Sequence, residues 1–197
     1  MNKLLLIGCG GHAKSIIDVV ENKKDWQIGG LIGLEKEIGK KLGSYQVIGS
    51  DNNIFDLRES FAFAFVGIGS IKNQGKRERI FNYLLEKKFE IPVLSSTNAY
   101  VSSNSILGKG TFLSHGVVVN SASKIGNNCI VNSKTLLEHD VEIGDNCHIS
   151  TGVIINGGCK IGNNSFIGSG AILRENIKIP PNTIITAGKR IMGWPLK

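Results

Sequence analysis

The second half of the chain carries an aliphatic residue at every sixth position from Val101 to Ile185, without a gap. A small or β-branched residue stands two positions before most of them, as Ser105 stands before Leu107. A helix cannot keep a period of six on one face, whereas short strands joined by tight corners can. The period therefore predicts a parallel β-helix built from hexapeptides. The aliphatic series is Val101, Leu107, Leu113, Val119, Ile125, Val131, Leu137, Ile143, Ile149, Ile155, Ile161, Ile167, Leu173, Ile179 and Ile185.

Glycine adds a second period, because Gly108, Gly126, Gly144 and Gly162 recur every eighteen residues. Three hexapeptides would then close one triangular coil, and the fourth would stack on the first. Pro180 takes the next place in this column, which indicates that the β-helix ends soon after it.

Alternation along each short strand points one side chain of the hexapeptide outward, between two that point inward. One outward column is charged and two are apolar. The charged column is Lys124, Glu142, Lys160 and Lys178, and the apolar columns are Val118, Leu136, Ile154 and Ile172, and Phe112, Ile130, His148, Phe166 and Ile184. Two bare apolar faces would be unfavourable in a monomer, so we expect neighbouring subunits to cover them in a three-fold oligomer.

The first part of the chain follows a different pattern, in which apolar strands alternate with amphipathic helices. We expect strands at residues 3–7, 27–32, 45–48, 62–68 and 89–93, and helices at residues 13–21 and 76–88. The side chains expected to face inward are Ile16, Ile17 and Val20 from the first helix and Ile80, Leu84 and Leu85 from the second. The alternation predicts a small Rossmann-like parallel α/β sheet. We therefore expect two domains, residues 1–95 and residues 96–197.

A glycine-rich loop, Gly8-Cys9-Gly10-Gly11-His12-Ala13, joins the first strand to the first helix. Such a loop directs backbone N–H groups and the positive end of the helix at one point, where a phosphate can bind. Gly67-Ile68-Gly69 follows another strand and would form the opposite wall at the same sheet edge. The acid that binds the ribose of NAD after the second strand is missing, because Leu31-Ile32-Gly33-Leu34 stands there. The loop then fits a nucleotide-sugar diphosphate, or is a tight structural turn.

Composition limits the other function classes. The chain has 41% apolar and 20% charged residues, which is ordinary for a globular protein. Its net charge of +7 favours an anionic ligand, but the lysines are dispersed and no nucleic-acid-binding motif occurs. We find no signal peptide and no stretch that could span a bilayer, so we expect a cytoplasmic protein without membrane insertion. Cys129, Cys147 and Cys159 hold the inward small position and should be reduced core residues rather than a disulfide or metal set.

Two histidines of the repeats are candidates for chemistry. His139 lies at a corner between Glu138 and Asp140, and Gly157, one coil further on, would leave bare backbone beside its imidazole. A histidine near an acid can act as a general base, and the glycine lets a thioester come close enough for a backbone N–H to hold its oxygen. The alternative for His139 is a solvated corner residue. His148 is the one polar member of its apolar column, and it could equally be an interface residue.

The order of these motifs resembles a known family. The glycine loop with its histidine, Gly67-Ile68-Gly69, residues 131–140 and 143–150 and the closing Gly193-Trp194-Pro195 together are similar to the hexapeptide acyltransferases that comprise the bacterial UDP-4-amino-sugar N-acetyltransferases and sialic acid O-acetyltransferases. The resemblance covers nearly the whole chain. It implies a left-handed β-helix, a homotrimer, acetyl-CoA in the groove between adjacent β-helices and a sugar nucleotide held by the first domain. The implied reaction is N-acetylation of the 4-amino group of a UDP-amino-sugar, with O-acetylation of a sialic-acid-type sugar as the alternative and no metal.

By matching position, the resemblance implies that His139 is the general base and Asp140 its acidic partner. The residues it assigns to acetyl-CoA are His148, Gly157, Gly168 and Pro195, with the Gly157 N–H facing the acetyl carbonyl. The residues expected around the sugar nucleotide are Gly8, Gly10, Gly11 and His12, with Gly67 and Gly69 on the other wall. The chain departs from the family at Ile32-Gly33-Leu34, where acids are common, and at Trp194, where a smaller apolar residue is usual.

Two other function classes stay open. A zinc enzyme on the same fold, such as a β-helical carbonic anhydrase, would need three converging histidines. His115, His139 and His148 lie on different columns, which argues against such a site. A non-catalytic solenoid for binding or scaffolding is the remaining alternative.

Overall fold

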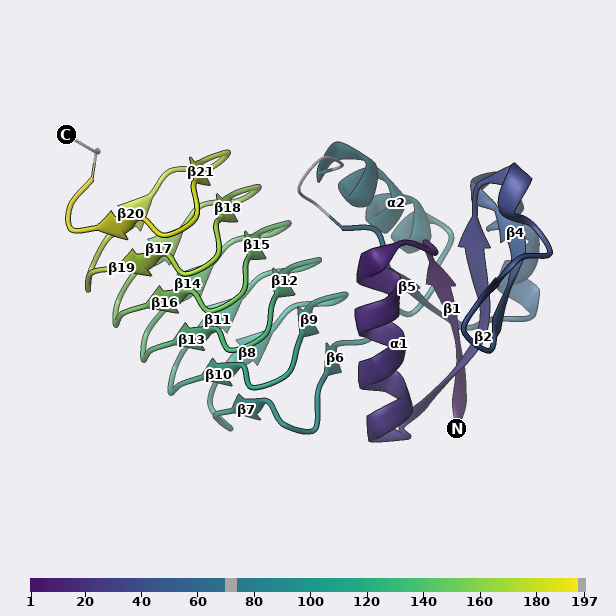
Figure 1. The fold of residues 1–197 in the computed structure, drawn as a ribbon, viewed down its shortest axis with the longest axis horizontal. Coiled ribbons are helices and arrows are strands. Elements are labelled where there is room, and N and C mark those ends of the chain that lie inside the picture. Colours follow the sequence, from purple (N-terminus) through teal and green to yellow (C-terminus); the bar gives the residue numbers. More distant parts are fainter. Residues whose placement is uncertain (70–73, 195–197) are drawn as a thin grey trace. The chain divides into compact units, whose positions relative to one another are not determined.

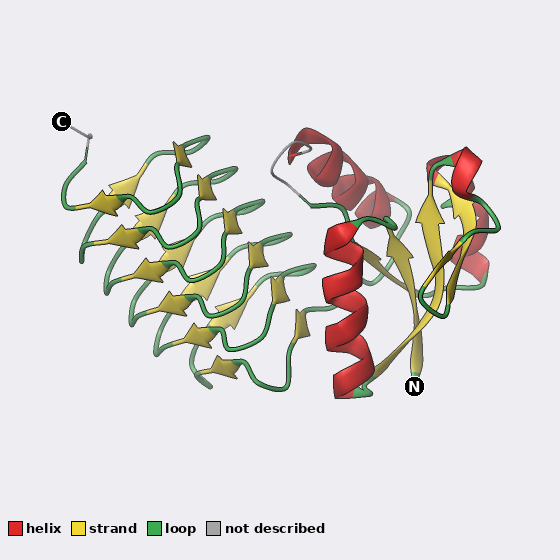
Figure 2. Ribbon diagram, viewed as in Figure 1, coloured by secondary structure: helices red, strands yellow, loops and turns green. Residues whose placement is uncertain are grey.

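The computed structural model describes residues 1–69 and 74–194. The chain divides into two compact units, Met1–Leu94 and Ser95–Lys197 (Figure 1). Each unit has its own secondary structure, an α/β sheet in the first and a stack of short strands in the second (Figure 2).

The first unit contains a five-stranded sheet in the order β3-β4-β2-β1-β5. All neighbouring pairs are parallel except β3 with β4. The strands are β1 (Asn2–Ile7), β2 (Trp26–Gly33), β3 (Lys41–Leu42), β4 (Tyr45–Ser50) and β5 (Phe63–Val66). The helices are α1 (Gly11–Lys23) and α2 (Gln74–Glu86), with short 3-10 turns η1 (Glu35–Glu37), η2 (Asp51–Asn53) and η3 (Asp56–Glu59). The predicted α/β class and the strand-loop-helix order at the glycine loop are confirmed.

Burial explains why these segments form. Leu4 to Ile7 of β1 are fully buried, as expected for a central parallel strand covered on both faces. Ile16, Ile17 and Val20 of α1 are buried as predicted. On α2 the buried stripe is Arg77, Ile80, Phe81 and Leu84, which has helical spacing. Leu85 falls at the edge of this stripe and is 38% exposed, so its predicted inward position is wrong.

The predicted strand at residues 89–93 does not form. Only one parallel bridge, between Phe63 and Glu90, joins this segment to the sheet. Pro92 has no N–H for a sheet ladder, which explains why pairing stops there. The next strand, β6 (Leu94–Ser95), belongs to a sheet of the solenoid instead.

The second unit is a left-handed parallel β-helix in which each strand pairs with the strand eighteen residues later, as Val118 pairs with Leu136. Its two-residue strands form three parallel sheets. The apolar face, as we call the first, holds β7 (Tyr100–Val101), β10 (Val118–Val119), β13 (Leu136–Leu137), β16 (Ile154–Ile155), β19 (Ile172–Leu173) and β22 (Arg190–Ile191). The charged face holds β8 (Ile106–Leu107), β11 (Lys124–Ile125), β14 (Glu142–Ile143), β17 (Lys160–Ile161) and β20 (Lys178–Ile179). The histidine face holds β6, β9 (Phe112–Leu113), β12 (Ile130–Val131), β15 (His148–Ile149), β18 (Phe166–Ile167) and β21 (Ile184–Ile185). The predicted coil of three hexapeptides is confirmed (Figure 1).

The corners have a period of their own. Every sixth residue from Gly110 to Gly188 has a left-handed φ near 60°, and most of these residues are glycine, asparagine or aspartate. These residue types tolerate that conformation best. Asp140 is one of them, with φ 58°. The corners are therefore tight turns that present the residue before the left-handed position, such as His139, to solvent.

Inward small residues form hydrogen bonds to the backbone of the next coil. The thiol of Cys129 donates to the carbonyl oxygen of Gly144 at 3.1 Å, and that of Cys147 donates to Gly162 at 3.2 Å. Thr111 and Ser123 make the same kind of bond with their hydroxyls. The core cysteines are buried and free, as predicted. Burial raises the pKa of the Cys129 thiol well above its usual value, which keeps this thiol neutral.

Candidate active site

His139 and Asp140 form a hydrogen-bonded pair at the corner between β13 and β14. His139 Nδ1 lies 2.8 Å from Asp140 Oδ2. An ionised carboxylate can only accept, so Nδ1 carries the proton of a neutral imidazole and Nε2 keeps its lone pair. Both side chains are about two-thirds exposed, at 66% and 64%. The pair thus presents a basic nitrogen to solvent, with its tautomer held by the acid.

The backbone of this corner is held by the coils on both sides. Ser123, one coil earlier, is fully buried, donates to the carbonyl oxygen of Glu138 at 2.7 Å and accepts from the Val141 N–H at 3.2 Å. The His139 carbonyl oxygen accepts from the Gly158 N–H at 3.0 Å. Sequence reasoning missed the role of Ser123, because its repeat position marks it only as a small inward residue.

Gly157 lies directly against the imidazole. A Cβ added at Gly157 would be 2.6 Å from His139 Cε1 and 2.7 Å from Nε2. Any side chain at this position would therefore displace the ring. The expected juxtaposition of His139 and Gly157 is present in the structure.

The backbone N–H of Gly157 is available to a ligand. Within the described residues it donates to no protein acceptor, whereas the N–H groups of Gly158 and Asn156 bond to the adjacent coils. At a different corner, the N–H of Asn127, at the equivalent turn position, is capped by Asp145 Oδ1 at 2.6 Å. The His139 corner has no such cap on Gly157 among the described residues, so the N–H beside the imidazole has no protein acceptor there.

The second carboxylate of the corner points elsewhere. Glu138 Oε2 accepts from Asn120 Nδ2 at 3.0 Å, which ties it to the preceding coil. Asp140 is therefore the acid that orients His139, and Glu138 is part of the side-chain ladder along the corner.

His148 does not join His139 within one chain. It lies on β15 of the histidine face, whereas His139 lies at the corner where the apolar and charged faces meet. The β-helix core separates these two positions. His148 is 4% exposed, its Nε2 lies 2.8 Å from Asn132 Nδ2, and its ring packs edge-to-face on Phe166.

The other predicted acetyl-CoA residues have structural surroundings of their own. A Cβ at Gly168 would meet Thr186 C at 2.7 Å, so coil stacking alone requires glycine there. Trp194 is half-buried and packs against the β-helix core, which it helps to cap. Pro195 lies outside the described residues. His115 bonds to Ser96 Oγ at 2.8 Å through Nδ1, at a corner away from His139.

The glycine loop and the segment after β5 meet in the first unit. Gly8 has φ 122°, and a Cβ there would lie 3.0 Å from the carbonyl carbon of Gly67. A Cβ added at Gly69 would lie 3.7 Å from His12 Cβ. Gly10 caps α1 without a side chain, and the space around Gly10 and Gly11 is open. The N-terminal N–H groups of α1 thus face an open edge of the sheet, where an anion can bind.

Glu37 places a carboxylate at this edge, which sequence reasoning missed. Its Oε2 accepts from the Leu34 N–H at 2.8 Å and from the Cys9 thiol at 3.2 Å. The short turn η1 returns the acid to the end of β2, although it stands four residues beyond Gly33. Burial and the Glu37 carboxylate raise the pKa of Cys9 to about 11, so this thiol is neutral near pH 7. Residues 31–34 hold no acid, as the sequence shows, but the fold brings the Glu37 carboxylate back to the end of β2.

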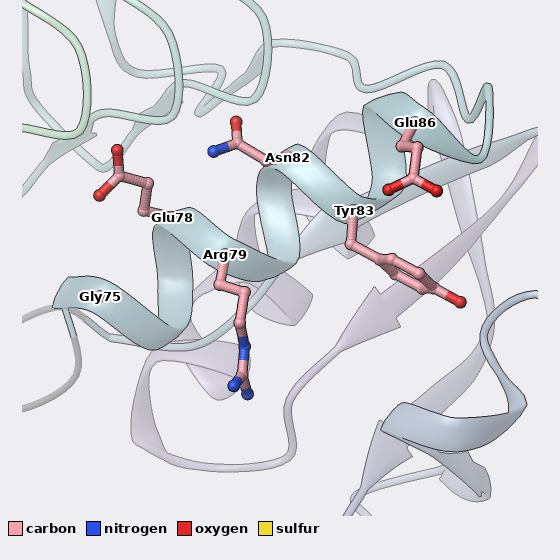
Figure 3. Close-up of a pocket in the computed structure, with 6 residues that line it drawn as sticks. All are labelled: Gly75, Glu78, Arg79, Asn82, Tyr83 and Glu86. Atoms are coloured by element: carbon pink, nitrogen blue, oxygen red, sulfur yellow. The ribbon is translucent and has the colours of Figure 1, made fainter.

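Two surface hollows lie away from these groups. One runs along α2 and is lined by that helix alone, through Gly75, Glu78, Arg79, Asn82, Tyr83 and Glu86 (Figure 3). The other follows the charged face beside Lys124, Lys160 and Lys178. Neither is lined by a histidine. No group of three or more potential metal ligands occurs among residues 1–69 and 74–194. No helix in that part of the chain is long and apolar enough to cross a membrane.

Comparisons with known proteins agree with this arrangement. Residues 3–84 match the PglD N-terminal domain, and residues 122–157 match the bacterial transferase hexapeptide (six repeats). A histidine-to-asparagine variant of perosamine N-acetyltransferase from Caulobacter crescentus, solved with CoA and GDP-perosamine, is 26% identical with a TM-score of 0.91, over 98% of this chain and 89% of that one. The acetyltransferase domain of PglB from Neisseria gonorrhoeae, solved with acetyl coenzyme A, is 28% identical with a TM-score of 0.84, over 97% and 93%. WeeI from Acinetobacter baumannii, at 18% identity and a TM-score of 0.69, shares the fold over 98% and 95%. No curated protein sequence is significantly similar.

The β-helix and the two family matches define a hexapeptide-repeat acyltransferase. The chain contains the PglD N-terminal domain and the bacterial transferase hexapeptide repeats, its structural neighbours are sugar N-acetyltransferases of the hexapeptide type, and it is an acetyltransferase. The family predicted from the motif order is thereby confirmed.

Proposed function

We propose that this enzyme transfers the acetyl group of acetyl-CoA to an amino group of a sugar nucleotide, with His139 as general base. The observation that carries the proposal is the His139 corner. An exposed imidazole with an acid on Nδ1 rests on a glycine whose N–H has no acceptor among the described residues. This combination of base and neighbouring donor suits acyl transfer from a thioester.

The reaction is a direct displacement. The amine nitrogen attacks the acetyl carbonyl carbon while His139 Nε2 removes its proton. The negative charge that develops on the carbonyl oxygen is stabilised by the Gly157 N–H. As the tetrahedral intermediate collapses, the C–S bond breaks, the amide C–N bond remains, and the proton on His139 passes to the departing thiolate. Asp140 stabilises the imidazolium and keeps its orientation.

The glycine loop is the proposed site of the sugar-nucleotide diphosphate. Gly10 and Gly11 expose the first N–H groups of α1, and Gly67 and Gly69 form the opposite wall. Glu37 lies at the end of β2, where an acid can accept hydrogen bonds from the nucleoside. A UDP-4-amino-sugar is our first candidate. GDP-perosamine is the second, because it is the ligand of the similar perosamine N-acetyltransferase.

We also propose that the working unit is a homotrimer. The outward residues of the apolar face, such as Leu136 and Ile154, are half-buried in the single chain and leave apolar surface for a partner. His139 and His148 lie on different sides of one β-helix, so both can line one acetyl-CoA groove only if two subunits contribute to it. Light scattering at several protein concentrations tests this assembly.

The acceptor is tested with radiolabelled acetyl-CoA against UDP-, GDP-, dTDP- and CMP-linked amino sugars and sialic-acid-type sugars. The proposal predicts label in an alkali-stable amide on one amino-sugar nucleotide. An alkali-labile ester on a sialic-type sugar would replace N-acetylation by O-acetylation. Absence of transfer to every acceptor, with no binding of CoA, would favour a non-catalytic solenoid.

A further inference from the structure

Arg77 is the buried charged residue of α2, and it contacts the backbone beside the proposed sugar-nucleotide site. The residue is only 2% exposed. Its Nη1 donates to the carbonyl oxygen of Val66 at 2.6 Å and to that of Ile68 at 2.8 Å. These two carbonyls flank Gly67, so one nitrogen of the guanidinium holds both ends of the peptide segment that forms the second wall.

The same segment is fixed on its other side by β1. The Gly67 N–H donates to the carbonyl oxygen of Ile7 at 2.7 Å. Gly67 also has no room for a side chain, because a Cβ there would be 2.9 Å from Leu6 Cδ1. With Arg77 on one side and β1 on the other, the carbonyl group of Gly67 is held against Gly8 of the glycine loop.

Electrostatics explains why an arginine is useful here. Parallel strands end with carbonyl oxygens at the edge where α1 directs its N–H groups. A diphosphate at this edge is attracted by the helix N-terminus and repelled by the carbonyl oxygens. A guanidinium that binds two of those oxygens removes part of the repulsion and adds a fixed positive charge. Burying this charge is costly, which a purely structural donor such as glutamine would avoid.

We infer that Arg77 is a positioning residue for the diphosphate, which holds the Gly67–Gly69 wall and makes the sheet edge more favourable for an anion. The inference rests on the proposed sugar-nucleotide function. It acts through the backbone of residues 66–68 and requires no contact between Arg77 and the ligand.

The variants Arg77→Gln and Arg77→Lys test this role. Glutamine keeps one neutral donor and removes the charge, whereas lysine keeps the charge and loses the planar fork. The matched control is Arg79→Gln, which removes the same charge from the same helix. Arg79 is exposed on the side of α2 that Figure 3 displays, and it makes no hydrogen bond within the described residues.

Calorimetric binding of UDP, GDP and CoA to each full-length variant is the readout, beside a thermal melt. Charge-assisted hydrogen bonds are lost in Arg77→Gln, so binding of the nucleoside diphosphate should weaken about tenfold or more. Arg77→Lys should fall between that variant and the wild type, Arg79→Gln should match the wild type, and CoA should bind all four proteins equally. If Arg77→Gln does not fold, the loss in Arg77→Lys carries the test.

Two results would overturn the inference. One is nucleoside-diphosphate binding by folded Arg77→Gln or Arg77→Lys that equals wild type. The other is an equal loss of diphosphate and CoA binding that follows the melting temperature, since that marks a structural role alone. A wild-type protein that binds CoA but neither UDP nor GDP would contradict the proposed acceptor class itself, which is a distinguishable failure.

Discussion

Replacing Gly157 by alanine tests whether the position of the imidazole governs the rate. The added Cβ would lie 2.6 Å from His139 Cε1 and 2.7 Å from Nε2. Non-bonded carbon atoms settle at about 3.5 to 4.0 Å, so the ring must retreat by about 1 Å. A displacement of about 1 Å in a reacting group costs about a hundredfold in rate. This loss corresponds to about 2.7 kcal/mol of transition-state stabilisation.

The fold should tolerate this change. Gly157 shares its turn position with Ser121, His139 and Glu175 of the same corner column, and its φ lies outside the left-handed region. The N–H donor is also retained in alanine. We therefore expect a wild-type melting temperature together with kcat about a hundredfold lower at saturating substrates.

A double-mutant cycle identifies the cause. In a His139→Ala background there is no ring to displace, so Gly157→Ala should lower the residual rate by less than about twofold. If the two losses multiply instead, alanine acts by another route, such as blocking the thioester, and the reasoning about ring position is wrong.

Three further predictions address the pair, the nucleotide edge and the coil stack. Asparagine and glycine both suit the left-handed φ of 58° at position 140, so Asp140→Asn and Asp140→Gly should melt at or above the wild-type temperature. The kcat should fall about tenfold or more in Asp140→Gly and less in Asp140→Asn, because the asparagine side chain still accepts a hydrogen bond from His139 Nδ1. Equal rates in the two variants would contradict a role for this hydrogen bond. Glu37→Gln removes a carboxylate that helps to raise the pKa of Cys9 to about 11, so the pKa of this thiol should fall. Iodoacetamide should then alkylate Cys9 faster at pH 8, by up to about tenfold for each unit by which the pKa falls. An unchanged alkylation rate would show that the contact between Cys9 and Glu37 is absent in solution. Gly126→Ala places a Cβ 2.7 Å from the backbone of Gly144 and Asp145 in the next coil. Overpacking of this kind costs about 1 to 3 kcal/mol, so the midpoint of chemical denaturation should fall. A wild-type midpoint would mean that the two coils can move apart without cost.

Regular repetition makes the β-helix predictable from sequence. The period of six places Ile143 and its equivalents inward, and the period of eighteen gives the strand register. Both follow because each coil repeats the same arrangement of inward side chains and corners. The same register predicts that Gly157 lies beside His139, since the two residues are one coil apart. Local pattern is sufficient for these features because their contacts lie at a constant sequence separation.

Features that depend on irregular backbone are not predictable in this way. Glu37 reaches the end of β2 through a short 3-10 turn, which no residue pattern indicates. Arginine is usually a surface residue, and the hydrophobic pattern does not reveal that the carbonyl oxygens of Val66 and Ile68 accept hydrogen bonds from the buried Arg77. The strand expected at residues 89–93 has the right apolar content, but Pro92 prevents the ladder. In each case the deciding feature is a backbone geometry or a partner that the hydrophobic pattern does not encode.

The most direct test of the central claim is the rate of acetyl transfer by His139→Ala with saturating acetyl-CoA and amino-sugar nucleotide. A positioned general base contributes about a hundred- to ten-thousand-fold, so kcat should fall by that factor in a protein that still folds and binds both substrates. A His139→Ala enzyme that turns over at the wild-type rate would contradict the assignment of His139 as the base.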